Sequence, residues 1–96
     1  MTGKQRAYLR KLANQIDVKY QIGKDGIEND KYITLINDAL EANELIKIHV
    51  LENSELTAET ACDLLCKLTD AFPVQVIGKK FVIYKKSEKK QKIVLP

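Results

Sequence analysis

Gln21-Ile22-Gly23-Lys24-Asp25-Gly26 ends an apolar-alternating run that begins at Val18, and a helical pattern follows it. Two glycines spaced this way allow a sharp turn, because glycine tolerates positive φ and has no Cβ to obstruct an approaching ligand. A helix that follows such a turn aims its free N–H groups and the positive end of its dipole at it. With the charge of Lys24 added, the pattern predicts a phosphate-binding turn. The alternative is an ordinary strand-to-helix turn, in which the glycines serve backbone geometry alone.

Periodicity on either side of this turn predicts seven elements. Thr2 and Gln5 have the spacing of a capping box, and Asn29 and Thr57 are expected to cap the second and third helices. Pro73 is expected to end the third helix, and Gly78-Lys79 to form the tip of a hairpin. The expected helices are 2–15, 29–42 and 57–72, and the expected strands are 18–22, 44–51, 74–77 and 80–84.

The order α-β-α-β-α-β-β predicts an α/β fold of the two-layer α+β type, built on a four-stranded mixed sheet. Strand–helix–strand units favour parallel neighbours, and the final hairpin adds an antiparallel pair. One side of the sheet is expected to be strongly apolar and the other partly open and weakly basic. That second side is expected to carry Lys19, Gln21, Lys47, His49 and Gln75.

The length of 96 residues predicts a single domain, 1–96, with 87–96 as a basic C-terminal extension. Ile93–Pro96 could add an edge strand or pack on the core. The first residues lack an apolar segment of the kind found in secretory signals, so a cytoplasmic protein is expected. A monomer is also expected. Cys62 and Cys66 are expected to be reduced residues at the edge of the core, because a C-x3-C pair and one histidine fall short of a structural zinc site.

Charge is segregated along the chain. Residues 1–24 have a net charge of +5, residues 25–77 a net charge of −8 and residues 78–96 a net charge of +6. If the two basic ends meet in the fold, they form one positive surface that suits a polyanion, with nucleic acid the first expectation. The alternative is that these basic ends are simply solvated.

Catalysis finds little support in the sequence. His49 is the only histidine, and no motif of a hydrolase, metalloprotease or nucleotide-binding loop is present. We expect no enzymatic activity, no cofactor and no metal. No pair of strand aromatics suits base stacking, so recognition of the backbone and shape of structured RNA is the better hypothesis.

Several stretches together resemble the CRM domain, whose name stands for chloroplast RNA splicing and ribosome maturation. They extend over essentially the whole chain, in the order found in that family, and the chain is most similar to its bacterial single-domain, YhbY-like members. The matching stretches are Thr2–Arg6, Tyr8–Arg10, Leu12-Ala13, Gln21–Gly26, Ala39–Ala42, Glu44–Lys47, Val76–Lys79, Phe81–Tyr84 and Lys92–Pro96.

The resemblance implies a fold similar to the C-terminal domain of translation initiation factor three. It also implies binding of RNA, specifically ribosomal RNA in precursors of the large ribosomal subunit, with a GxxG loop likened to that of KH domains. Two departures weaken the loop: Asp25 stands where relatives often have Asn, and Glu28-Asn29 replaces the usual Thr or Ser cap. The expected RNA-binding residues are Gly23, Lys24, Asp25, Gly26, Lys79, Lys80, Arg6, Arg10 and Lys47. The alternative function is a protein-interaction module that docks on a ribosomal protein or assembly factor through the acidic helices.

Overall fold

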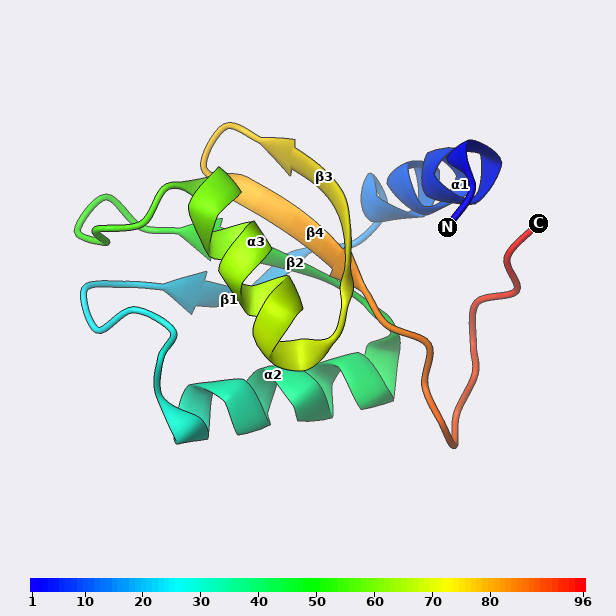
Figure 1. The fold of residues 1–96 in the computed structure, drawn as a ribbon. Coiled ribbons are helices and arrows are strands. Elements are labelled where there is room, and N and C mark those ends of the chain that lie inside the picture. Colours follow the sequence, from blue (N-terminus) through cyan, green and yellow to red (C-terminus); the bar gives the residue numbers. More distant parts are fainter.

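The computed structural model describes all residues, 1–96, and contains the seven predicted elements in the predicted order (Figure 1). None of its three helices combines the length and the apolar character needed to cross a membrane. The elements are α1 (Gly3–Ala13), β1 (Val18–Ile22), α2 (Asp30–Asn43), β2 (Leu45–Val50), α3 (Ala58–Thr69), β3 (Phe72–Ile77) and β4 (Lys80–Tyr84).

The four strands form one mixed sheet in the order β1-β2-β4-β3. β1 and β2 are parallel, as expected for strands joined by a crossover helix, whereas β4 is antiparallel to both β2 and β3. The predicted mixed sheet and the hairpin around Gly78-Lys79 are therefore confirmed. β1 and β3 are the edge strands.

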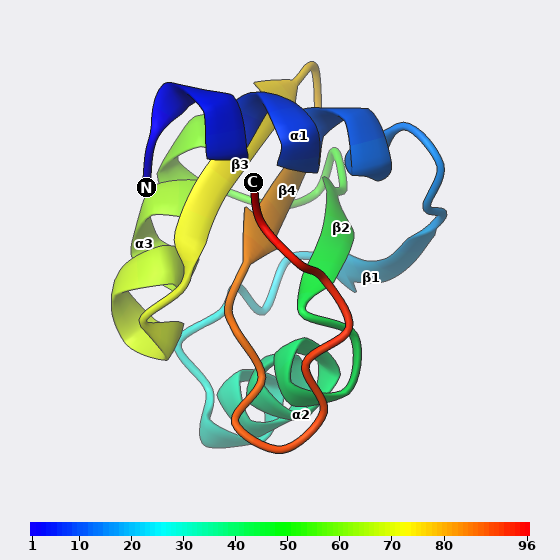
Figure 2. The same ribbon diagram turned by 90° about the vertical axis from the view of Figure 1, so that its right-hand side faces the viewer.

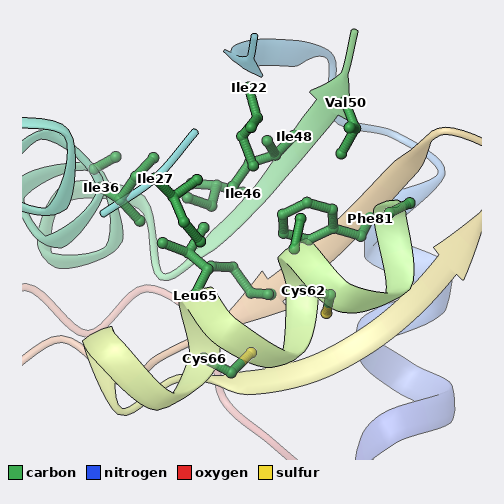
Figure 3. Packing of buried hydrophobic residues seen from close by; sticks show 14 of the residues in the cluster. Ile22, Ile27, Ile36, Ile46, Ile48, Val50, Cys62, Leu65, Cys66 and Phe81 are labelled. Carbon is green, nitrogen blue, oxygen red and sulfur yellow. The ribbon is translucent and has the colours of Figure 1, made fainter. Parts of the chain in front are cut away.

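α2 and α3 cover one face of the sheet and enclose the larger part of the core (Figure 1). Ile46 and Ile48 of β2 and Phe81 of β4 point into this layer, where they meet Ile36 of α2 and Leu65 of α3 (Figure 3). Cys62 and Cys66 are buried free thiols on the inner side of α3. They belong to the core itself, where small apolar groups fit between a helix and a sheet.

α1 packs on the opposite face of the sheet (Figure 2). Its residues Leu9 and Ala13 form a second, smaller cluster with Leu45, Val82 and Tyr84. The side expected to be partly open is therefore covered by a helix over part of its area. What remains open is the end of the sheet that lies beyond the C-terminus of α1.

Local capping signals explain where the helices begin. Thr2 and Gln5 form the predicted capping box, with each backbone N–H donating to the other side chain at 3.1 Å. Asn29 and Thr57 are the N-caps of α2 and α3, as predicted. The two helices that cover the large core therefore start at the residues that the sequence indicates.

The end of α3 differs from the prediction. The helix stops at Thr69 rather than continuing to Phe72, because Asp70 adopts a left-handed conformation with φ of 60°. Asp tolerates this conformation, which commonly ends helices. Phe72 and Pro73 consequently belong to edge strand β3, where a proline removes no interior ladder bond. Leu68, in the last turn of α3, is 44% exposed.

Residues 85–96 form a C-terminal strap that is tied to α2 and α1 without adding a strand (Figure 2). The carboxylate of Glu44, which is fully buried, accepts hydrogen bonds from the N–H groups of Ser87, Lys92 and Ile93. Glu41 accepts from the Ser87 hydroxyl at 2.7 Å and from two further N–H groups of the strap. Ile93 packs on the smaller cluster, so the apolar end packs on the core rather than extending the sheet.

Candidate nucleic-acid interface

The GxxG stretch is a tight turn directly after β1. The N–H of Gly26 donates to the carbonyl oxygen of Gly23 at 3.2 Å, and Gly26 has a φ of 72°, which favours glycine. The exposed N–H groups of Lys24 and Asp25 have no acceptor within the chain. These two donors and the exposed Lys24 side chain are what the turn offers to a phosphate.

α2 does not begin at this turn, contrary to the expectation of a helix N-terminus aimed at the ligand. Ile27, which is buried, and two further residues separate Gly26 from the helix. The Asn29 side chain accepts from the N–H groups of Lys31 at 2.9 Å and Tyr32 at 3.3 Å. Because its own cap occupies these donors, the helix contributes little to anion binding at the turn.

The start of α2 is nevertheless fixed against β1. The hydroxyl of Tyr32 donates to the carbonyl oxygen of Gln21 at 3.1 Å, and burial raises the pKa of Tyr32 to about 12. The N–H of Leu51 donates to the carbonyl oxygen of Ile22 at 2.9 Å. Both bonds accept at the last two residues of β1, so the strand that leads into the turn is held by α2 and by the loop after β2.

Acidic side chains surround the turn. It shares a cleft of about 240 Å³ with the loop after β2, and the lining of this cleft includes Asp25, Glu28 and Glu55 as well as Lys24. Three carboxylates against one lysine produce a local potential that opposes phosphate binding. The sequence already indicated that Asp25 and Glu28 would weaken phosphate binding at the turn. Glu55 is distant in sequence, and only the fold brings it to the turn.

Lys79 is at the tip of the β3–β4 hairpin, where its ammonium forms an ion pair with Glu52 at 2.9 Å. This is the only salt bridge in the chain, and the Lys79 hydrogen bond lowers the pKa of Glu52. Both side chains are largely exposed, so the pair adds little to stability. The ion pair matters for ligand binding instead, because Glu52 partly neutralises the charge that Lys79 could offer to a phosphate.

Lys47 and Lys80 lie on the open part of the sheet, on the same face as α1. The register pairs His49 with Lys80 and Lys47 with Val82, and side chains paired across neighbouring strands point to the same face. Lys47 is half-buried and Lys80 is exposed. Neither has a carboxylate within ion-pair distance.

Arg6 and Arg10 form an exposed ridge on α1 that continues to Asn14, because residues four apart share one side of a helix. Asn14 lines a small cleft together with Lys47 and Lys80, with a volume of about 130 Å³. The arginine ridge therefore leads onto the open sheet. We call the surface formed by Arg6, Arg10, Lys47 and Lys80 the basic face.

The predicted site residues thus fall into two groups. The basic face is one group, and Gly23–Gly26 with Lys79 is the other, at the end of the sheet where β1, β2 and the hairpin tip terminate (Figure 1). Lys19 was missed as a site residue, although it lies with Lys47 along a second cleft beside α1. The register of β1 against β2 shifts between Val18 and Tyr20, so strand alternation alone could not place Lys19.

Comparison with known proteins identifies the family of the chain. The profile of the CRS1/YhbY (CRM) domain matches residues 1–85. The chain belongs to the CRM domain family. It is 42% identical to the "Probable RNA-binding protein YqeI" of Bacillus subtilis, over all of this chain and 99% of that protein. It is 31% identical to an "RNA-binding protein" of Haemophilus influenzae, over all of this chain and 95% of that protein.

A solved relative confirms the fold of this CRM domain. The solution structure of SAV1595 from Staphylococcus aureus, described as a candidate RNA-binding protein, superposes with a TM-score of 0.80. The two sequences are 47% identical, and the match covers 100% of this chain and 99% of the other. The predicted family and the predicted α+β fold are therefore both confirmed.

Proposed function

We propose that this CRM domain binds structured RNA through its phosphate backbone, with the basic face as the main contact. The observation that carries the proposal is that Arg6, Arg10, Lys47 and Lys80 lie on one side of the molecule without an ion-pair partner. Unpaired cations on one surface release counterions from RNA when they meet its phosphates. The names of two relatives, both called RNA-binding proteins, support the same class of partner.

The GxxG turn is proposed as a second, weaker contact. The free N–H groups of Lys24 and Asp25 can donate to one phosphate, and Lys24 adds a positive charge. Asp25, Glu28 and Glu55 oppose that contact, and Glu52 competes for Lys79. We therefore expect the basic face to supply most of the affinity for RNA, and the turn to help orient the RNA once it is bound.

We further propose that the RNA is ribosomal RNA in precursors of the large ribosomal subunit, and that the protein assists their assembly without catalysing a reaction. Membership of a family whose name includes ribosome maturation supports this choice. A contact dominated by phosphates suits a folded RNA in which most bases are already paired.

Sedimentation of the tagged protein from a cell lysate, at low and at high salt, tests this proposal. Co-migration with particles near the large subunit that is lost at high salt is the expected result, because phosphate contacts weaken steeply with salt. Co-migration that salt does not affect would favour docking on a ribosomal protein. Migration at the top of the gradient under both conditions would contradict a ribosomal partner.

A further inference from the structure

A further cleft lies beside the basic face, and no function has yet been assigned to it. Its lining residues come from the C-terminal end of α1 and the segment after it, the first residues of β1 and β2, the end of α2 and the C-terminal strap. Its volume of about 460 Å³ is within the range of small-molecule sites, roughly 300–1,000 Å³. A single nucleobase would fit within it.

One wall of the cleft is apolar and carries an aromatic ring. Ile16 from the segment after α1, Tyr20 from β1 and Ile93 from the strap contribute to this wall. Tyr20 is half-buried: it packs against the large core and also lines the cleft. An aromatic residue in the apolar wall of a cleft suits stacking of a flat base.

The lining of the cleft also includes groups that match the polar edge of a base. The Asn43 amide donates to the carbonyl oxygen of Ala39 at 3.0 Å, which leaves its side-chain oxygen free to accept. The side-chain amide of Gln15 makes no hydrogen bond within the chain, and Asp17 adds a carboxylate. Donors and acceptors on an apolar cleft are the usual composition of a site that orients a small planar ligand.

Positive charge connects the cleft to the proposed path of the RNA backbone. Lys47 lines both this cleft and the smaller cleft that contains Lys80, and Lys19 lies on the rim. A backbone held on the basic face therefore passes the mouth of the cleft. We propose that the cleft binds one unpaired nucleobase of that RNA, such as a bulged nucleotide. This inference rests on the proposed RNA-binding function.

Two RNA hairpins with equal numbers of phosphates test it, one fully paired and one with a single-nucleotide bulge. Fluorescence anisotropy gives the Kd of each for the wild type, Tyr20→Leu and Tyr20→Phe. Leucine keeps the apolar volume against the core and removes the ring, whereas phenylalanine keeps the ring. We expect the wild type and Tyr20→Phe to bind the bulged hairpin about fivefold more tightly or better, since one stacked base contributes about that much.

For Tyr20→Leu, the Kd values of the two hairpins are expected to differ by no more than about twofold. Its Kd for the paired hairpin is expected to equal that of the wild type. A wild type without preference, or a preference that Tyr20→Leu retains, would overturn the inference but leave RNA binding intact. Failure to bind either hairpin at low salt would overturn the proposed function as well.

NMR of the ¹⁵N-labelled wild type provides a test that needs no variant. The side-chain amide signals of Gln15 and Asn43 are expected to shift with the bulged hairpin and to shift much less with the paired one. Equal shifts with both hairpins, or none with either, would overturn the base site.

Discussion

Glu44 is the residue on which the position of the C-terminal strap depends most. It has no solvent exposure and adopts a φ of 64°, which is uncommon for a residue with a side chain. Its carboxylate binds the N–H groups of residues 87, 92 and 93. A buried charge is tolerated only where such donors replace its lost hydration. The strap and this carboxylate therefore stabilise one another.

Glu44→Gln is expected to lower the free energy of unfolding by roughly 2 kcal/mol, because the amide group would face an N–H donor and leave it unpaired. Urea unfolding measures the change. Glu41→Gln is the matched control: it also contacts the strap but is more exposed, so its loss should be smaller. Equal and negligible losses in both variants would contradict this role of Glu44.

Acid should weaken the fold through the same two carboxylates. Burial opposes ionisation of Glu44, but the N–H donors of the strap outweigh it and lower its pKa. The Ser87 hydroxyl and strap N–H groups likewise lower the pKa of Glu41. Their contribution is complete above the ordinary pKa of about 4.5 and is lost as pH falls through the lower folded-state values.

Unfolding free energies measured between pH 7 and pH 3 are expected to show this loss in the wild type. The double variant Glu41→Gln/Glu44→Gln should be less stable at pH 7 and should lose less on acidification. An identical pH dependence in the two proteins would contradict the assignment.

At the scale of elements, the two glycines of the turn have different tasks. Gly26 needs its positive φ, whereas an added Cβ at Gly23 would meet its nearest neighbours only at 3.7 Å, an ordinary contact distance. Gly26→Ala should therefore destabilise the fold by about 1 kcal/mol, and Gly23→Ala by less than about 0.5 kcal/mol. Thermal unfolding of both variants checks this, and a larger loss at Gly23 would contradict the turn geometry.

Elements were predictable from the sequence where their signals are local. The capping box of Thr2 and Gln5, the Asn29 cap and the alternation in β1 and β2 each involve residues within a few positions of one another. The end of α3 was misplaced because Pro73 gave a stronger local signal than the left-handed Asp70. Residues 87–96 were predicted to be a basic extension from their composition alone. The hydrogen bonds that hold them join Glu44 to residues more than 40 positions later in the chain, and no local signal in the sequence indicates such bonds.

At the scale of the whole molecule, folding divides the positive charge between two regions that the sequence could not separate. Lys24 and Lys79 lie among carboxylates at one end of the sheet, whereas Arg6, Arg10, Lys47 and Lys80 form the basic face. The sequence therefore indicated which basic residues could bind RNA. It did not show which of them have carboxylates close by in the fold. Only the fold brings Glu55 to the turn and Glu52 to Lys79, so the sequence showed only part of the negative charge that opposes anion binding there.

The salt dependence of RNA affinity in paired charge reversals tests the central claim most directly. We predict that Lys47→Glu/Lys80→Glu loses most of the affinity and lowers the slope of log Kd against log salt by roughly 1.5, as for two lost phosphate contacts. Lys24→Glu/Lys79→Glu should lose less, though more than about 0.5 kcal/mol. Lys67→Glu, exposed on α3, is the control and should bind nearly as the wild type does. Wild-type affinity in Lys47→Glu/Lys80→Glu, with loss only in Lys24→Glu/Lys79→Glu, would contradict the account.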